Sequence, residues 1–116
     1  MRIHHVQVMM PRGQEATAQR FYGEALGLSR VPKPADMPNP DGAWFALAEG
    51  QLHVGVQDGE VVRSRAHVAL LIDDLDALVE RLDAAGFACT PSNPVDGLRR
   101  AHVNDPFGNR LELMGR

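Results

Sequence analysis

The sequence predicts an α+β fold in which two copies of a βαβββ module follow one another along the chain. The chain has 116 residues, which is twice 58. A His-Val dipeptide followed by mostly apolar residues opens the stretch His5–Met10 and again the stretch His67–Ile72. Each stretch is typical of a strand, and each precedes a helical pattern and three short extended segments. We therefore expect a first module over residues 1–60 and a second over residues 61–116, which together form one domain.

The first module continues with a helix that ends at a glycine. Phe21, Tyr22, Ala25 and Leu26 fall on one helical stripe, and Gly27 stands where a left-handed C-cap is required. The three extended segments of this module are expected near Leu28–Val31, Ala43–Ala48 and Gln51–Gln57.

The second module contains the clearest helix of the sequence. Asp74 can cap its N-terminus and Gly86 can end it. Between them apolar residues recur at helical spacing, at Leu75, Leu78, Val79, Leu82 and Ala85. Extended segments are expected near Ala88–Pro91, Leu98–Asn104 and Arg110–Met114, and turn residues precede the last strand of each module at Glu49–Gly50 and Asp105–Asn109.

A proline-rich segment, Pro32–Gly42, separates two of the extended segments of the first module. It holds half of the eight prolines of the chain, so we expect a stiff loop. Two interpretations stay open: a long hairpin connection, or a flap that covers a site.

The composition excludes several classes of function. Apolar residues make up 44% and charged residues 23% of the chain, and the net charge is −3, which is typical of one globular domain. Nucleic acids and anionic membranes are not expected as partners, because the chain has no run of Lys or Arg. The single cysteine, Cys89, reads as a small buried residue. No apolar stretch is long enough for a membrane span or a signal peptide, so we expect a cytoplasmic protein.

The strand pattern indicates which way the five histidines point. Side chains alternate between the two faces of a strand, and the apolar residues of each strand must face the helices. His4 alone shares the apolar face. The polar face away from the helices then receives His5, His53, His67, His102 and Glu112.

Three of these side chains form a candidate metal site. His5 and His67 occupy the same place in each module, and Glu112 lies on the final strand. Two neutral imidazoles and one carboxylate are a common ligand set for a divalent ion that keeps open positions for a substrate. The alternative is that each histidine is an ordinary half-exposed polar residue. Arg100, on the same face, could bind an anionic substrate or belong to a solvated edge.

Four stretches, in this order, carry a family resemblance: Ile3–Val6, Phe21–Leu28, His67–Leu75 and Asp105–Leu113. Over essentially its full length the chain resembles the glyoxalase/bleomycin resistance/dioxygenase group, the vicinal oxygen chelate superfamily. The resemblance implies a curved mixed sheet around a metal-centred cavity, with His5, His67 and Glu112 as ligands. It also implies a homodimer, in which each site could draw ligands from both chains.

One position departs from the pattern of the family. Members with four protein ligands, such as glyoxalase I, take one from the last strand of the first module, and the matching residue here is Gly55. His53 could act as a substitute ligand or line the pocket. Classical glyoxalase I activity is therefore not expected, and a set of two histidines and one glutamate resembles the fosfomycin-resistance thiol transferases and the extradiol dioxygenases. The thiol transferases typically carry Thr at the position of Gln7.

The main functional hypothesis is a metal-dependent enzyme that acts on a small oxygenated molecule. One divalent ion per site (Fe, Zn, Mn or Ni) would chelate substrate oxygens as a Lewis acid. His53 and His102 are the candidates for proton transfer, and Gln7, Trp44 and Arg100 are the candidates for substrate binding. Isomerase or lyase, thiol transferase and dioxygenase chemistry all stay open.

Two other hypotheses need no chemistry. The chain could be a drug-binding protein of the bleomycin-resistance kind, with Trp44, Phe45 and the proline-rich loop as apolar walls. It could also be a purely structural domain in which the histidines are remnants of an ancestral site.

Overall fold

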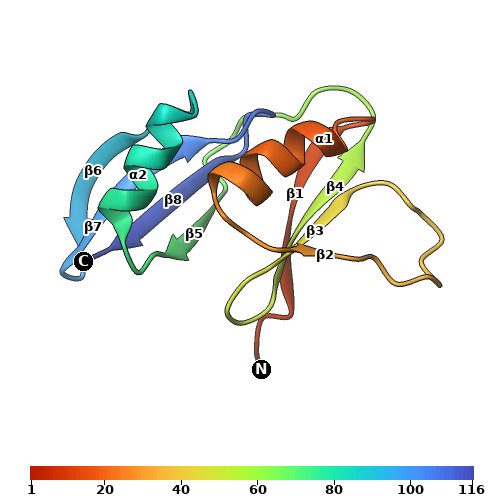
Figure 1. The fold of residues 1–116 in the computed structure, drawn as a ribbon, viewed down its shortest axis with the longest axis horizontal. Helices are drawn as coiled ribbons and strands as arrows, with labels where there is room; N and C mark the ends of the chain where they lie inside the picture. Colours follow the sequence, from red (N-terminus) through yellow and green to blue (C-terminus); the bar gives the residue numbers. More distant parts are fainter. The chain divides into compact units, whose positions relative to one another are not determined.

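The computed structural model describes residues 1–116, and its contacts divide the chain into two compact units, Met1–Val61 and Val62–Arg116. Each unit contains one strand, then helical structure, then three strands (Figure 1). The predicted α+β fold of two βαβββ modules is therefore confirmed.

The first unit builds a mixed four-stranded sheet in the order β1-β4-β3-β2. β1 runs parallel to β4, and the other neighbours are antiparallel. The elements are β1 (His5–Pro11), α1 (Glu15–Ala18), a π-helical segment η1 (Gln19–Ala25), β2 (Arg30–Val31), β3 (Ala43–Ala46) and β4 (Gln51–Gln57).

The second unit repeats this topology in a sheet of order β5-β8-β7-β6. β5 is parallel to β8, and the other pairs are antiparallel. The elements are β5 (His67–Leu71), α2 (Leu75–Ala84), β6 (Thr90–Val95), β7 (Leu98–Asn104) and β8 (Arg110–Gly115).

The helical segment of the first unit buries the predicted apolar stripe. Phe21, Tyr22, Ala25 and Leu26 are all buried, and the ring of Tyr22 lies 5.6 Å from that of Phe45 on β3. The expected single helix is instead a short α-helix followed by η1. The wider turns of a π-helix allow neighbouring residues, Phe21 with Tyr22 and Ala25 with Leu26, to face inward together. These contacts place the core of the unit between η1 and one face of the sheet.

Helix α2 begins and ends as the sequence predicts. The carboxylate of Asp74 accepts a hydrogen bond from the backbone N–H of Ala77 at 3.1 Å. At the other end Gly86 has a φ of 90°, and the N–H of Phe87 donates to the carbonyl of Leu82, which completes a Schellman motif. The buried face of α2 and the sheet beneath it form the core of this unit, from Leu75, Leu78, Leu82, Ala101, Val103, Leu111 and Leu113.

Several strands differ from the expected limits, and the differences at β2 and β6 have identifiable reasons. Leu28 is not extended, because its N–H donates to the carbonyl of Tyr22 and closes the helix end, so β2 begins at Arg30. β6 extends beyond the expected Pro91 to Val95. It lies at the edge of its sheet and carries an irregular register between Ser92 and Val95, which is where a strand tolerates proline.

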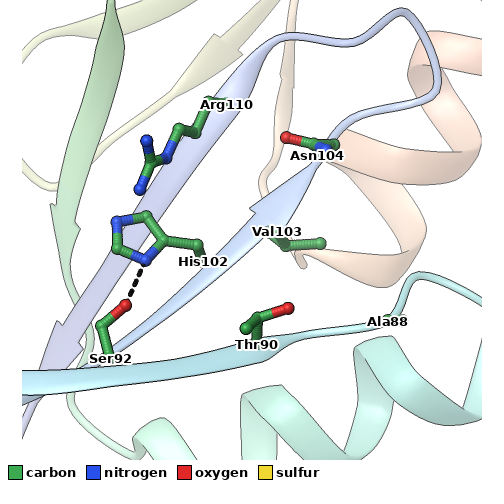
Figure 2. A pocket seen from close by; sticks show the side chains of 7 residues that line it. All are labelled: Ala88, Thr90, Ser92, His102, Val103, Asn104 and Arg110. Atoms are coloured by element: carbon green, nitrogen blue, oxygen red, sulfur yellow. Dashed lines mark hydrogen bonds between the residues drawn. The ribbon is translucent and has the colours of Figure 1, made fainter. Parts of the chain in front are cut away.

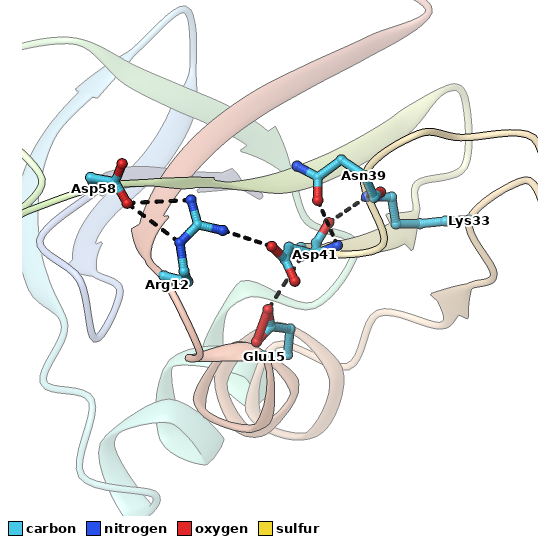
Figure 3. Close-up of polar contacts among 7 residues, drawn as sticks. Arg12, Glu15, Lys33, Asn39, Asp41 and Asp58 are labelled. Atoms are coloured by element: carbon cyan, nitrogen blue, oxygen red, sulfur yellow. Dashed lines mark hydrogen bonds and ion pairs between the residues drawn. The ribbon is translucent and has the colours of Figure 1, made fainter.

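The proline-rich segment Pro32–Gly42 connects the antiparallel strands β2 and β3, as a hairpin connection does. Polar contacts hold its base (Figure 3). Arg12 forms ion pairs with Asp41 at 2.8 Å and with Asp58 at 3.3 Å. Lys33 donates to the backbone carbonyls of Asn39 and Asp41.

One face assignment from the sequence is wrong. His4 does not share the apolar face, because β1 starts only at His5 and His4 is exposed. Its Nδ1 lies 2.9 Å from Nδ1 of His5. Among the helices, none has both the length and the apolar character that a membrane crossing requires.

The N-cap of α2 gives a first testable prediction. Asp74→Ala should lower the free energy of unfolding by about 1 kcal/mol, because the N–H of Ala77 loses its acceptor. Asp74→Asn should retain most of the stability. Urea unfolding measures both, with the exposed neighbour Asp73→Ala as the control for the loss of charge. Equal losses in the Asp73 and Asp74 variants would contradict the capping role.

Candidate functional site

The first and last strands pair in the same register in both units. Side chains at equivalent positions of the two units can therefore be matched. In the first unit β1 and β4 pair His5 with Gln51 and Gln7 with His53. In the second unit β5 and β8 pair His67 with Arg110 and Ala69 with Glu112. His5 and His67 are therefore equivalent, as the sequence repeat predicts.

The same register identifies the partner of Glu112 in the first unit. Counting from the equivalent histidines, the residue that matches Glu112 is His53. The alignment with the family pattern puts Gly55 at this position, which is two residues too far along β4. Strand pairing is set by turn geometry, and a shift of two residues leaves every side chain on the same face, so the apolar pattern cannot detect it.

In the second unit His67 and Glu112 are in direct contact. Nε2 of His67 lies 3.0 Å from Oε2 of Glu112. Nδ1 of His67 lies 2.9 Å from the backbone carbonyl oxygen of Arg65, which can only accept a hydrogen bond. Nδ1 therefore carries a hydrogen, and Nε2 faces the carboxylate oxygen of Glu112. An imidazole nitrogen and a carboxylate oxygen approach this closely when a proton or a metal cation lies between them.

Glu112 is a buried carboxylate with 6% of its surface exposed. Its Oε1 accepts a hydrogen bond from Nη1 of Arg100 at 2.7 Å, and Nε of Arg100 donates to the carbonyl of Asn93. The hydrogen bond from Arg100 lowers the pKa of Glu112, although burial opposes the shift. Glu112 is thus ionised at neutral pH with one oxygen bound to Arg100 and the other directed at His67.

The turn before β8 sets the position of this strand. Asp105 is buried, and its carboxylate accepts hydrogen bonds from the backbone N–H groups of Phe107 and Asn109 and from the side-chain amide of Asn109. This Asx-type turn carries the most specific part of the family resemblance, and its role is to start β8 in the register that directs Arg110 and Glu112.

A pocket of about 380 Å³ lies on β6, β7 and β8 of the second unit (Figure 2). Nδ1 of His102 lies 2.6 Å from Oγ of Ser92. Burial and the nearby charge of Arg110 lower the pKa of His102, so its ring is neutral at pH 7. The polar side chains that line the pocket are those of Thr90, Ser92, His102, Asn104 and Arg110.

In the first unit His53 is enclosed in a stack of rings. Its ring lies 3.9 Å from that of Trp44 and 4.2 Å from that of His5, measured between centroids, and both pairs are nearly parallel. Nζ of Lys33 lies 5.9 Å from the centroid of the Trp44 ring. Nε2 of His53 lies 2.8 Å from Oε1 of Gln51. Burial, followed by the charges of neighbouring His and Lys side chains, lowers the pKa of His53 to about 4.

Gln7 occupies the space that a side chain at position 55 would need. A Cβ added to Gly55 would lie 2.6 Å from Nε2 of Gln7. The amide also donates to Sδ of Met9 at 3.6 Å. A side chain at position 55 would therefore have to displace the end of the exposed Gln7 side chain.

The apolar wall expected of Trp44 and Phe45 is not formed. Phe45 points to the helical side of the sheet and is fully buried against Tyr22. Trp44 points to the other side, where its ring stacks on His53 and Nζ of Lys33 lies 5.9 Å from its centroid. Alternation along β3 separates these neighbours, so they cannot line one pocket.

The structure brings together some of the sequence-predicted site residues. His67, Arg100 and Glu112 form one contact network in the second unit, and His102 lies beside it. His5 lies in the first unit. No group of three or more His, Cys, Asp or Glu side chains converges in a way that could hold a metal ion.

Sequence reasoning missed several partners of these residues. The backbone carbonyls of Arg65 and Asn93 orient His67 and Arg100, and backbone groups leave no trace in residue identity. Ser92 was also missed. Its position on the polar face of β6 could have indicated it, had the strand been expected to continue beyond Pro91.

Comparison with known proteins supports the fold and the family. The model of the Glyoxalase/Bleomycin resistance protein/Dioxygenase superfamily matches residues 2–113. The structure of a glyoxalase family protein from Bacillus anthracis is 34% identical, with a TM-score of 0.92 over 100% of this chain and 95% of that one. No curated protein matches the sequence.

Two more distant structures share the fold. Lactoylglutathione lyase from Agrobacterium tumefaciens is 19% identical, with a TM-score of 0.70 over 95% of this chain and 91% of that one. The fosfomycin resistance protein FosX from Listeria monocytogenes is 17% identical, with a TM-score of 0.73 over 100% of this chain and 93% of that one. Taken with the family model, the repeated βαβββ topology and the equivalent histidines of the two units, these findings show that the chain belongs to the glyoxalase/bleomycin resistance protein/dioxygenase superfamily.

Proposed function

We propose that this protein is a metal-dependent enzyme that acts on a small oxygenated molecule, with His5, His67 and Glu112 as the metal ligands. The observation that carries the proposal is the arrangement of His67 and Glu112. Nε2 and Oε2 are 3.0 Å apart, and each is oriented by a hydrogen bond to the other end of its group. Such outer hydrogen bonds are typical of histidine and carboxylate ligands of metal ions.

An imidazole nitrogen and a carboxylate oxygen that face each other in this way would both serve as ligands of a divalent ion. Arg100 occupies only Oε1 of Glu112, so Oε2 stays available as a single oxygen ligand. His5 is proposed as the third ligand because it has the same register position in the first unit as His67 has in the second.

His53 is the less suitable candidate for a fourth ligand. Its ring stacks nearly parallel on that of His5, with the centroids 4.2 Å apart. Its Nε2 is already engaged by Gln51. We propose that His53 is a structural residue that supports the ring of His5.

A divalent ion held in this way would supply Lewis-acid stabilisation of negative charge on substrate oxygens. The side chains of this protein have separate tasks. Arg100 keeps Glu112 ionised and fixed in one orientation. We propose that His102 exchanges a proton with the substrate, because it lines the pocket and is neutral, and Ser92 fixes its Nδ1.

The reaction type does not follow from the related structures. One is named a lactoylglutathione lyase and another a fosfomycin resistance protein, and at 19% and 17% identity they share the fold alone. The binding-protein alternative has less support than the enzyme, because the structure forms no apolar wall from Trp44 and Phe45. The polar pocket beside Glu112 favours chemistry instead.

Metal analysis tests the proposal directly. Protein purified without added ions should contain about one divalent ion per site, as measured by inductively coupled plasma mass spectrometry. His67→Ala and Glu112→Ala should each weaken binding at least about tenfold, because each removes a ligand. His5→Ala should do the same.

Glu80→Ala is the matched control, since Glu80 is an exposed carboxylate on α2. This variant should retain the metal content of the wild type. Metal-free wild-type protein, or unchanged metal content in the His67 and Glu112 variants, would refute the proposed site. Binding of a bulky apolar drug by the metal-free protein would instead favour the binding-protein alternative.

Mixing of variants tests whether a dimer shares its ligands. If each site takes His5 from one chain and Glu112 from the other, a mixture of His5→Ala and Glu112→Ala proteins should regain metal in about a quarter of the sites after subunit exchange. Sites that draw all ligands from one chain should regain none.

The low pKa of His53 predicts a pH dependence of stability. Below about pH 6.5 the unfolded chain protonates this residue, whereas the folded chain does so only near pH 4. The free energy of unfolding should therefore fall by about 2–3 kcal/mol between pH 7 and pH 4 through this group. Urea unfolding with a chelator present measures the effect. His53→Gln should flatten this part of the profile, and an identical profile in the variant would contradict the prediction.

A further inference from the structure

The pocket of the second unit contains a cation without a partner. Arg110 lines this pocket and is half-buried, yet it makes no ion pair and no side-chain hydrogen bond. Figure 2 shows its guanidinium beside the imidazole of His102. The two arginines of β7 are paired, Arg99 with Asp76 and Arg100 with Glu112. The five donors of the Arg110 guanidinium are thus open to an acceptor that enters the pocket.

The register places donors on both sides of Arg110. Across the sheet its neighbours are His67 on β5 and Asn104 on β7. Because side chains two apart along a strand share a face, Arg110 and Glu112 point to the same side and start about 6.8 Å apart. His102 lies next to Glu112 in the adjacent strand. These five positions form a compact polar block in which Arg110 is directly beside His67 and Glu112.

The charges of this block favour an anion. Oε1 of Glu112 is neutralised by Arg100 at 2.7 Å, so its charge does not satisfy Arg110. Arg110 is therefore the uncompensated charge of the pocket, and Asn104 and Thr90 add uncharged polar groups that can contact oxygen atoms.

We propose that Arg110, together with Asn104, binds an anionic group of the substrate, either a carboxylate or a phosphonate or phosphate. A guanidinium binds two oxygens of such a group with parallel hydrogen bonds. The inference deepens the proposed function, because it names the substrate as an anion whose charged end occupies the pocket.

The spacing also limits the size of the substrate. Arg110 and Glu112 start one strand repeat, roughly 7 Å, apart on β8, so an anion bound by Arg110 lies near Glu112. A molecule with only a few atoms between its anionic group and its reacting oxygens spans this distance. We therefore expect small carboxylates or phosphonates to bind better than long or neutral molecules.

Direct binding to the metal-free protein tests the proposal without relying on activity. The full chain, treated with a chelator, is titrated with methylphosphonate and separately with acetate, while nuclear magnetic resonance follows the side-chain amide of Asn104. Acetamide serves as the neutral probe. We expect saturable shifts with at least one of the two anions and none with acetamide, and the preferred anion distinguishes carboxylate from phosphonate recognition.

Variants assign the binding to Arg110. Arg110→Gln should weaken anion binding at least about tenfold, and Arg110→Lys should restore only part of it, because lysine lacks the planar fork. Arg99→Gln is the matched control, since it removes the same charge from the neighbouring strand, where Arg99 pairs with Asp76 on α2, and should bind like the wild type.

Failure of this inference differs from failure of the proposed function. Absence of saturable shifts with both anions, or equal losses in the Arg99 and Arg110 variants, would overturn the anion site, whatever the metal content. Anion binding that depends on Arg110 in a protein that never holds metal would sustain the anion site and refute the metalloenzyme.

Discussion

The parallel pairing of the first and last strand of each unit is the constraint on which the site depends. β1 pairs with β4 and β5 with β8 in the same register, so equivalent positions carry His5 and His67, and His53 and Glu112. Apolar side chains on the opposite face hold this pairing in place, because they are buried under helical structure. A shift by one residue would expose the core and turn the polar side chains inward.

The two units share this topology but differ in their polar faces. In the first, the rings of His5, His53 and Trp44 stack on one another, which keeps His53 neutral and engaged. In the second, Glu112 is held by Arg100 and contacts His67, and a pocket stays open beside them. The ring stack of the first unit can hold a neighbouring side chain in place, whereas the pocket of the second unit can bind a small molecule. The proposed chemistry is therefore concentrated in the second unit.

The hydrogen bonds of the second unit explain why its charges can be buried together. Arg100 neutralises one oxygen of Glu112, and Asn93 fixes Arg100 in turn. A buried carboxylate without such a partner would take up a proton instead. Arg110 has no partner in this network, and an anionic substrate would supply one. The metal proposal and the anion proposal thus concern neighbouring, but separately testable, parts of one polar face.

The sequence by itself determined the repeat, the α+β class, the limits of α2 and the face on which four histidines and Glu112 lie. These features depend on local periodicity and on capping residues such as Asp74, which act over a few neighbouring positions. The tertiary structure decided that His53 rather than Gly55 matches Glu112, that Phe45 and Trp44 lie on opposite faces of β3, and that Arg110 is left unpaired. Strand register and hydrogen bonds to backbone carbonyls depend on contacts between distant segments, and such contacts leave no periodic pattern in the chain.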